Sequence, residues 1–209
     1  MLDYEKDIFN KGYKLIVGCD EAGRGPLCGP VVCASWILPI DYRNELIDDS
    51  KKLTDKKRRV LFEEIKKVAL SYAIVAIYPE EIDKINIYEA SRKGMTEAIK
   101  QMDIKPDYIL TDCMPLLEFP NIPQENLVKG DARAMCIAAA SILAKVTRDD
   151  MLDELDKQYP QYNLKKHKGY PTKEQIELLN KYGPIKGVYR FSYKPVQLAS
   201  LEKISLLED

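Results

Sequence analysis

Two adjacent carboxylates, Asp20 and Glu21, follow an apolar run and precede a turn rich in glycine. Residues 13–17 are predicted to form a strand that enters the core, so we expect the pair where this strand becomes a loop, half removed from water. Two anions in such a place repel each other unless a cation neutralises them. The Gly-Arg-Gly turn at residues 23–25 allows the backbone close to a ligand and offers a forked donor suited to phosphate. The stretch therefore indicates a divalent metal ion and a phosphodiester, although an Asp-Glu pair alone is more often a solvated turn.

The glycine-rich turn does not match two familiar phosphate-binding loops. The third glycine of a dinucleotide-binding loop would fall at Cys28, and Pro26 interrupts the helix start that such a loop requires. A Walker-type loop is excluded as well, because no Gly-Lys-Ser/Thr follows at the right spacing.

Two further acids follow predicted strands. Asp112 ends an apolar run at residues 107–112, and Asp131 comes soon after a short run at residues 126–128. Ligand sites of α/β sheets lie at the carboxyl ends of strands, so we expect these acids to meet the Asp-Glu pair there. Taken alone, Asp131 is equally well placed to cap the next helix.

Carboxylates gathered in this way suit two-metal hydrolysis of a phosphodiester. Oxygen ligands favour hard ions such as Mg²⁺ or Mn²⁺. Two such ions would position and deprotonate a water and stabilise the leaving oxygen, so no side-chain nucleophile is needed. The hypothesis gives Asp20 the bridging position, with Glu21, Asp112 and Asp131 completing the ligand shells.

Composition restricts the alternatives. The 209 residues are 45% hydrophobic and 31% charged, which is enough for one domain with a sizeable core, or one domain with a small appendage. The net charge is −1, so nucleic-acid binding would have to depend on local patches. His167 is the only histidine and stands in a run of lysines, which excludes sites with several imidazole ligands. We expect it at the surface or facing nucleic acid.

Cysteine usage and the N-terminal residues predict a cytoplasmic protein. The five cysteines are odd in number and include no C-x-x-C pair, as expected of small buried residues in a reducing compartment. The first residues are charged and contain no apolar run long enough for a signal peptide or a membrane span.

Apolar runs alternate with amphipathic segments, which predicts an α/β protein. The first two strands are expected to pair through the Gly-Arg-Gly turn. Thr54 is the expected cap of a helix that buries Val60, Leu61, Ile65 and Val68. Small residues predict a helix packed closely on the sheet, on which Lys145 and Arg148 are candidates to steady acidic neighbours. The predicted strands are residues 13–17, 31–38, 72–78, 107–112 and 126–128, and the other predicted helices are residues 1–12, 85–102, 132–151, 174–181 and 195–207.

From residue 160 onward, tyrosines alternate with cations. Aromatic rings can stack on sugars or bases while the charges follow phosphates. We expect most of these tyrosines to pack against a small helical lobe instead. Lys51, in the loop before Thr54, is a candidate for contact with a nucleic-acid backbone. The tyrosines are Tyr159, Tyr162, Tyr170, Tyr182, Tyr189 and Tyr193.

Six separate blocks, in one order, resemble bacterial ribonuclease HII, a type 2 ribonuclease H. The resemblance runs from about residue 18 to residue 195. The blocks are DEAGRGPL at residues 20–27, DSKKL at 49–53, EID at 81–83 with NI at 86–87, KGD at 129–131, AAASILAKVTRD at 138–149 and HKGYPT at 167–172.

The resemblance implies a ribonuclease H-like α/β fold, a central mixed five-stranded sheet flanked by helices with a small C-terminal helical lobe. It implies a catalytic domain at residues 1–158 and a substrate-binding helical extension at residues 159–209. The implied enzyme is an endonuclease that uses two ions, Mn²⁺ or Mg²⁺, and acts as a monomer. It cleaves the RNA strand of RNA–DNA hybrids and single ribonucleotides in duplex DNA, as in ribonucleotide excision repair, and leaves 5′-phosphate and 3′-hydroxyl ends.

By residue match, Gly23, Arg24 and Gly25 would read the 2′-hydroxyl and the adjacent phosphate, and Tyr170 would pack on the following deoxyribose. The 2′-hydroxyl is the group that distinguishes RNA from DNA. The related ribonuclease HIII has Gly-Lys-Gly-Asp after its acidic pair and an extra N-terminal domain, whereas Gly-Arg-Gly-Pro stands here after a short lead-in. Two positions depart from the family pattern, because Gln175 lies where many relatives have histidine and Cys113 where glycine is usual.

Two other functions remain open from the residues alone. The chain could be a different metal-dependent nuclease or phosphatase on the same architecture. It could also be a non-catalytic module that binds hybrids and whose acids merely cap helices.

Overall fold

The computed structural model describes residues 3–47 and 53–205, which form two compact units. The sheet unit comprises Met1–Ala22, Val32–Ala76 and Ser91–Val146, and the helical unit comprises Gly23–Val31, Ile77–Ala90 and Thr147–Asp209. The strands are β1 (Ile16–Ala22), β2 (Val31–Ile37), β3 (Ser71–Ile77), β4 (Tyr108–Asp112) and β5 (Gln124–Leu127). The α-helices are α1 (Asp3–Asn10), α2 (Asp55–Val68), α3 (Pro79–Gln101), α4 (Met135–Gln158), α5 (Leu164–His167), α6 (Lys173–Tyr182) and α7 (Lys194–Ser205). Two 3-10 helices are η1 (Gly130–Ala132) and η2 (Pro160–Tyr162).

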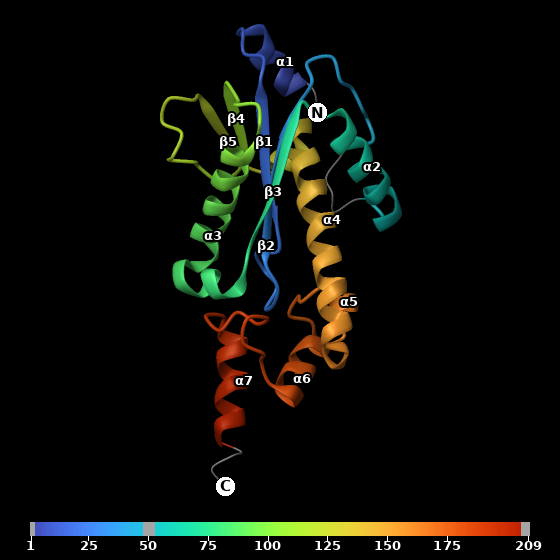
Figure 1. Ribbon diagram of the computed structural model, residues 1–209, viewed down its shortest axis with the longest axis vertical. Helices are drawn as coiled ribbons and strands as arrows, with labels where there is room; N and C mark the ends of the chain where they lie inside the picture. Colours follow the sequence, from blue (N-terminus) through green and yellow to red (C-terminus); the bar gives the residue numbers. More distant parts are fainter. Residues whose placement is uncertain (1–2, 48–52, 206–209) are drawn as a thin grey trace. The chain divides into compact units, whose positions relative to one another are not determined.

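The five strands form one sheet in the order β3-β2-β1-β4-β5, with β1 at its centre (Figure 1). β1 pairs antiparallel with β2 and parallel with β4, and β4 pairs parallel with β5. The sheet is therefore mixed and the protein is α/β, which confirms the predicted fold class. The predicted pairing of the first two strands is confirmed as well.

Helix α2 begins where the sequence predicts, but its buried face differs. The Thr54 hydroxyl accepts a hydrogen bond from the Lys57 amide at 3.4 Å, so Thr54 is the N-cap. Val60 is 64% exposed, and the prediction that it lies in the core was wrong. Arg58 takes that place, because its guanidinium donates to the Leu53 carbonyl at 2.8 Å while its stem packs with Leu61 and Ile65 along one helical stripe.

Helix α4 begins against the central strand, held there by the absence of a side chain at Gly18. A Cβ at Gly18 would lie 2.1 Å from the Cys136 carbonyl carbon, so only glycine allows β1 and the start of α4 this close. The Glu5 side chain of α1 accepts a hydrogen bond from the Cys136 amide at 2.9 Å. Acidic side chains stabilise helix N-termini, so α1 caps α4 across most of the chain. The small residues at the start of α4 are buried, as predicted.

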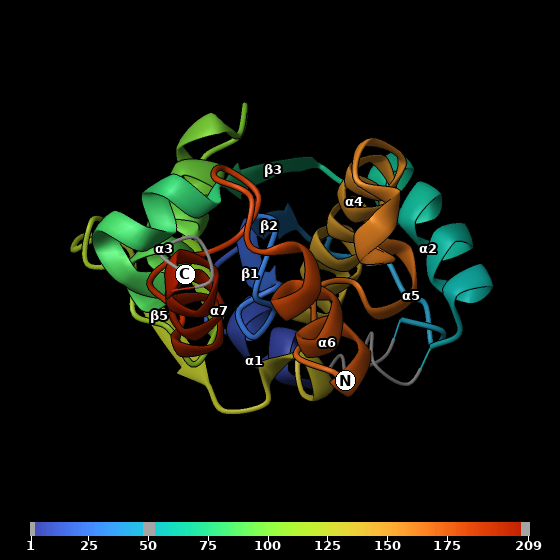
Figure 2. The same ribbon diagram turned by 90° about the horizontal axis from the view of Figure 1, so that it is seen from below.

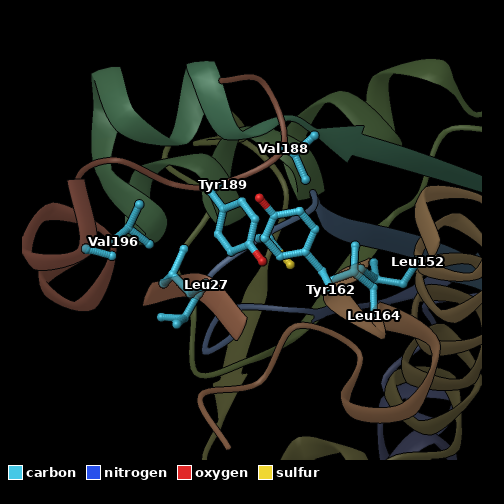
Figure 3. Packing of buried hydrophobic residues seen from close by; sticks show 10 residues of the cluster. Leu27, Leu152, Tyr162, Leu164, Val188, Tyr189 and Val196 are labelled. Carbon is cyan, nitrogen blue, oxygen red and sulfur yellow. The ribbon is translucent and has the colours of Figure 1, made fainter. Parts of the chain in front are cut away.

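The helical unit has a core of its own. Tyr162 and Tyr189 pack with ring centroids 5.3 Å apart at the centre of a cluster that includes Leu27 and Leu152 (Figure 3). Helices α6 and α7 lie side by side in both ribbon views (Figures 1 and 2). Of the six tyrosines expected mainly to pack, Tyr162 and Tyr189 are buried, whereas Tyr170 and Tyr182 are 43% and 40% exposed.

His167 is buried in the helical unit, so the expectation of a surface residue was wrong. Its Nε2 lies 2.9 Å from the Tyr162 carbonyl, and its Nδ1 accepts a hydrogen bond from the Gly169 amide at 3.1 Å. The ring is therefore neutral with its proton on Nε2, and burial lowers the pKa of His167 in agreement with this role. The neighbouring lysines in the sequence therefore do not make the histidine a surface residue.

Helix α3 changes direction at Asn86, which has φ 68°. The Asn86 Oδ1 accepts hydrogen bonds from the Tyr88 and Glu89 amides at 2.9 and 3.1 Å, so this side chain caps the second part of the helix. The start predicted at residue 85 matches this second part.

Across the residues described, we find no helix with both the length and the apolar character that a bilayer span requires.

Candidate active site

Asp20 and Glu21 lie within β1, and the prediction that the strand ends before them was wrong. β2 continues to pair with β1 through Glu21↔Cys33 and Ala22↔Val32, so the ladder holds the acids in extended backbone. Asp20 is only 4% exposed and Glu21 is partly buried. Because successive side chains of a strand point to opposite faces, these two carboxylates leave the strand in different directions.

Parallel pairing places Asp112 beside Asp20. Cys19 of β1 is in register with Thr111 of β4, so the acids that follow each of them occupy neighbouring positions at the same end of the sheet. Asp112 is in turn in register with Leu127 of β5. Its Oδ1 accepts a hydrogen bond from the Gly130 amide at 2.9 Å, which ties the end of β4 to the start of η1.

Asp131 follows Gly130 directly, inside η1, and is 4% exposed. The structure thus places it next to the residue whose amide binds Asp112. It does not stand at the start of α4, so the alternative that Asp131 caps this helix was wrong. Glu5 binds the Cys136 amide there instead, at 2.9 Å.

The environment of Asp20, near the ends of β1 and β4, is unfavourable for its negative charge. Burial raises the pKa of Asp20 well above its ordinary value, and the charges of Glu21 and Asp112 raise it further. A hydrogen bond from Ser141 of α4 and one from the Glu21 amide oppose the shift only in part. The two charges that shift Asp20 have its own sign, so a bound cation would relieve the repulsion.

These residues fit a hard divalent ion in chemistry, although a complete ligand cage is not preformed. Within residues 3–47 and 53–205, no three Asp, Glu, His or Cys side chains stand in an arrangement that could hold one ion together. The opposite directions of Asp20 and Glu21 account for part of this. Mg²⁺ commonly keeps several waters and uses one or two protein carboxylates together with substrate phosphates. A site completed by water and substrate therefore suits this donor set.

In the helical unit, the predicted substrate-binding turn is held by two buried arginines. Arg190 donates to the carbonyls of Gly23, Arg24 and Gly29 at 2.7 to 3.0 Å. Arg148 donates to the carbonyls of Cys28, Pro30 and Lys168 at 3.1 to 3.2 Å. The expectation that Arg148 steadies acidic neighbours was wrong, because all three of these partners are backbone carbonyls.

The exposed residues of this turn lie close to Tyr170. Gly23 has φ 101°, a conformation that favours glycine, and Arg24 and Gly25 are exposed. The Tyr170 ring lies 3.7 Å from where a Cβ on Gly25 would be. Gln175 is fully buried and donates to the Tyr189 hydroxyl at 3.3 Å and to the Cys28 sulfur at 3.9 Å, so it lies in the interior and not at the exposed turn. Lys51 lies outside the described residues.

The sequence reasoning missed several residues that position the site. Ser141 stood in the small-residue helix and gave no signal of its own. Glu5 was an ordinary acid in a short helix, 131 positions from the amide it binds. Arg190 is one of the cations that alternate with tyrosines after residue 160, and its place in Tyr-Arg-Phe-Ser offered no local reason to expect burial.

Known proteins are similar to this chain in both sequence and fold. A family model described as ribonuclease HII matches residues 17–196. The chain is 47% identical over 197 residues to a ribonuclease HII of a Geobacillus species, with 94% of this chain and 70% of that protein covered. It is 48% identical over 195 residues to the ribonuclease HII of Acholeplasma laidlawii, with 93% and 95% covered.

Solved structures agree. The crystal structure of ribonuclease H2 from Pyrococcus horikoshii superposes with a TM-score of 0.75 at 26% identity, covering 89% of this chain and 97% of that one. Bst-RNase HIII in complex with Mn²⁺ shares the fold at 15% identity, with a TM-score of 0.69 and 91% and 70% covered. On these grounds the chain belongs to the ribonuclease HII family and is a ribonuclease H.

Proposed function

We propose that this enzyme hydrolyses the RNA strand of RNA–DNA hybrids and cleaves at single ribonucleotides within duplex DNA, leaving 5′-phosphate and 3′-hydroxyl ends. The observation that carries the proposal is the buried Asp20, whose pKa is raised by burial and by the charges of Glu21 and Asp112. Shifted carboxyls grouped at strand ends are typical of catalytic sites. Membership of the ribonuclease HII family supports the substrate class.

Asp20, Glu21, Asp112 and Asp131 are proposed to hold two divalent ions, Mn²⁺ or Mg²⁺, with Asp20 between them. When bound, the ions would activate water and stabilise the leaving oxygen. Ser141 and the Glu21 amide keep the Asp20 carboxylate oriented, and the Gly130 amide does the same for Asp112 at 2.9 Å. Such fixed orientation reduces the rearrangement that the carboxylates need when they bind ions.

Substrate recognition is assigned to the helical unit. Gly23, Arg24 and Gly25 are proposed to read the 2′-hydroxyl and the neighbouring phosphate, with Tyr170 packed on the following deoxyribose. The exposure of Arg24 and of the Tyr170 ring supports this. Lys51 is proposed to contact the nucleic-acid backbone, on sequence grounds alone.

Three further expectations accompany this function. We propose that residues 159–209 act as a substrate-binding extension of a catalytic domain at residues 1–158. We also propose a cytoplasmic location, which the four buried, unpaired thiols support. The enzyme is expected to work as a monomer.

The experiment compares two duplexes that differ by one 2′-hydroxyl, one all-DNA and one with a single ribonucleotide, with Mg²⁺ and Mn²⁺ in parallel. Cleavage is expected only at the ribonucleotide. Asp112→Asn keeps the oxygen that binds the Gly130 amide but removes the charge, so kcat/KM should fall by about 10³-fold or more while hybrid binding persists.

Asp103→Asn is the matched control, because Asp103 is exposed on the loop after α3 and should leave cleavage unchanged. Unchanged cleavage by Asp112→Asn would contradict the assignment of the acids. Cleavage of the all-DNA duplex would favour a different metal-dependent nuclease, and binding without any cleavage would favour a non-catalytic module.

A further inference from the structure

We propose that Arg190, assisted by Tyr193, is a positioning residue that determines how strongly the enzyme prefers a ribonucleotide over a deoxyribonucleotide. It would do so by fixing the backbone of the Gly23-Arg24-Gly25 turn. The inference rests on the proposed role of this turn in reading the 2′-hydroxyl. Neither residue needs to touch the substrate.

Arg190 is fully buried, and each of its three side-chain nitrogens donates a hydrogen bond to a carbonyl of this turn or its stem, residues 27–29. Nη2 donates to the Gly23 carbonyl at 2.7 Å and to the Gly29 carbonyl at 2.9 Å, and Nε donates to the Gly29 carbonyl at 3.0 Å. Nη1 donates to the Arg24 carbonyl at 3.0 Å. One planar guanidinium therefore joins both arms of the turn, a geometry that the single ammonium of lysine does not reproduce.

Tyr193 completes the arrangement. Its hydroxyl accepts a hydrogen bond from Arg190 Nη1 at 3.0 Å and donates one to the Arg24 carbonyl at 2.6 Å. The Arg24 carbonyl thus receives two donors. Chains of hydrogen bonds strengthen one another, so the plane of this peptide group is well fixed.

The direction of these carbonyls decides the direction of the amides beside them. In a trans peptide the C=O and N–H groups point to opposite sides, and the described chain contains no cis bond. With the Gly23 carbonyl bound to Arg190, the Arg24 amide points away from the guanidinium. With the Arg24 carbonyl bound to Arg190 and Tyr193, the Gly25 amide points away from both.

Two successive amides directed to one side form a concave donor pair that suits an oxygen ligand such as a phosphate or a hydroxyl. This is the chemistry that recognition of a 2′-hydroxyl and its phosphate requires. The 2′-hydroxyl offers little binding energy, so its detection depends on donors that are already in place before the substrate arrives.

Arg190 is itself held from outside the turn. The Asp83 carboxylate accepts hydrogen bonds from the Phe191 and Ser192 amides at 2.9 and 2.8 Å. The Ser192 hydroxyl donates to it at 2.6 Å. Asp83 therefore fixes the segment that follows Arg190, which gives the EID block at residues 81–83 a role in this unit.

Residues 27–29, the stem of the turn, are held by backbone hydrogen bonds that do not involve the Arg190 side chain. The Leu27 amide donates to the Gly169 carbonyl and the Gly29 amide to the Val188 carbonyl, each at 2.8 Å. Loss of the Tyr193 hydroxyl should therefore loosen the tip of the turn while the stem stays in place. This separation makes a selective defect possible.

The experiment measures binding in the Asp112→Asn background, so that no cleavage interferes. Fluorescence anisotropy gives the Kd for two duplexes that differ only by one 2′-hydroxyl, and their ratio is the ribonucleotide preference. Tyr193→Phe and Arg190→Lys are compared with the Asp112→Asn parent. Tyr88→Phe is the matched control, since it makes the same chemical change on an exposed tyrosine of α3. Circular dichroism establishes which variants are folded.

We expect Tyr193→Phe and Arg190→Lys to reduce the preference by about 3- to 10-fold, the effect of one or two lost hydrogen bonds. The Kd for the all-DNA duplex should stay within about 2-fold, because phosphate contacts elsewhere dominate it. Tyr88→Phe should match the parent. Arg190→Lys retains the positive charge, so its defect would come from lost geometry.

A folded Tyr193→Phe variant that keeps the full preference overturns the inference, even if Arg190→Lys fails to fold. Equal weakening toward both duplexes overturns it too, because that pattern indicates a general contribution of charge or stability. A parent without any preference would instead refute the proposed function, and the inference with it.

Discussion

Each unit of the molecule groups like charges around a buried side chain, and the two groups are satisfied in opposite ways. In the sheet unit, the charges of Glu21 and Asp112 raise the pKa of the buried Asp20 beyond the effect of burial alone. In the helical unit, burial and the charge of Arg190 lower the pKa of Arg148 to about 10. Both clusters are electrostatically unfavourable when considered as charges only.

The difference lies in the hydrogen bonds. Arg148 and Arg190 donate to backbone carbonyls, of which all but that of Lys168 belong to residues 23–30, so each nitrogen of the two planar groups meets an acceptor. Asp20 receives hydrogen bonds from Ser141 and from the Glu21 amide, but burial and the charges of Glu21 and Asp112 still raise its pKa. A buried like-charge pair satisfied by the backbone holds the structure together, whereas one left under repulsion is prepared to bind an ion.

The largest effect on stability is expected where the satisfied pair is broken. Arg148→Met should lower the free energy of unfolding by about 3 kcal/mol, because three backbone carbonyls lose their donor, two of them in buried contacts and that of Lys168 in a part-buried one. Urea denaturation provides the measurement. Arg43→Met is the matched control, since Arg43 also donates to carbonyls but is exposed, and water should replace it at a cost of about 0.5 kcal/mol. Equal losses in the two variants would refute the comparison.

Removal of the Asp20 charge should have the opposite effect and raise the free energy of unfolding. A carboxyl whose pKa is raised by folding stabilises the protein below its unfolded pKa, and that stability is lost as the pH rises through the folded pKa. Asn does not ionise, so without divalent ions Asp20→Asn should be more stable than the wild type at pH 7 by about 1 to 2 kcal/mol. The gain should disappear below the ordinary aspartate pKa of 3.8. A less stable variant at pH 7 in EDTA would contradict the account of this edge.

Glu5 lies between these two cases, because its Oε1 accepts a hydrogen bond from the Cys136 amide of α4, whereas its Oε2 is buried without a hydrogen-bond partner and burial raises the pKa of the carboxyl. Glu5→Ala should reduce the free energy of unfolding by about 1 kcal/mol through loss of the cap. Glu5→Gln keeps the acceptor oxygen and should lose less than half of that. Asp7→Ala, on an exposed position of the same helix, serves as the control in thermal unfolding. If alanine and glutamine lower stability equally, the charge and not the acceptor is what α4 requires.

The smallest effect concerns backbone strain at the two sites. The Gly-Arg-Gly turn has glycine where φ is positive, as at Gly23, but near the acids it is Cys113, directly after Asp112, that has φ 59°. Cys113→Gly should therefore raise the free energy of unfolding by about 0.5 kcal/mol, since relief of strain slightly exceeds the added freedom of the unfolded chain. Cys113→Ala keeps the strained φ and should not share the gain. A stability loss in the glycine variant would show that the thiol contact with the Leu127 carbonyl at 3.6 Å matters more.

Local patterns predicted the elements well because they depend on near neighbours. Thr54 caps its helix since the interaction spans three residues, and the strands follow apolar runs whose burial any sheet requires. The boundaries failed where a partner strand decided them, as at Asp20 and Glu21, which the ladder with β2 keeps extended. His167 failed for a related reason, because its cationic neighbours in sequence are not its neighbours in space.

The sequence by itself determined the family and the fold class and singled out the four acids that we propose as ligands, because these follow from residue types at fixed spacing and from apolar periodicity. Only the tertiary structure decided that Asp20 is repelled by Asp112, that Glu5 caps α4, and that Arg190 holds the Gly-Arg-Gly turn. Each of these contacts joins residues about 90 to 170 positions apart. No local pattern specifies such pairs, since they form only when the whole chain has buried its apolar surface and each polar group inside must find a partner.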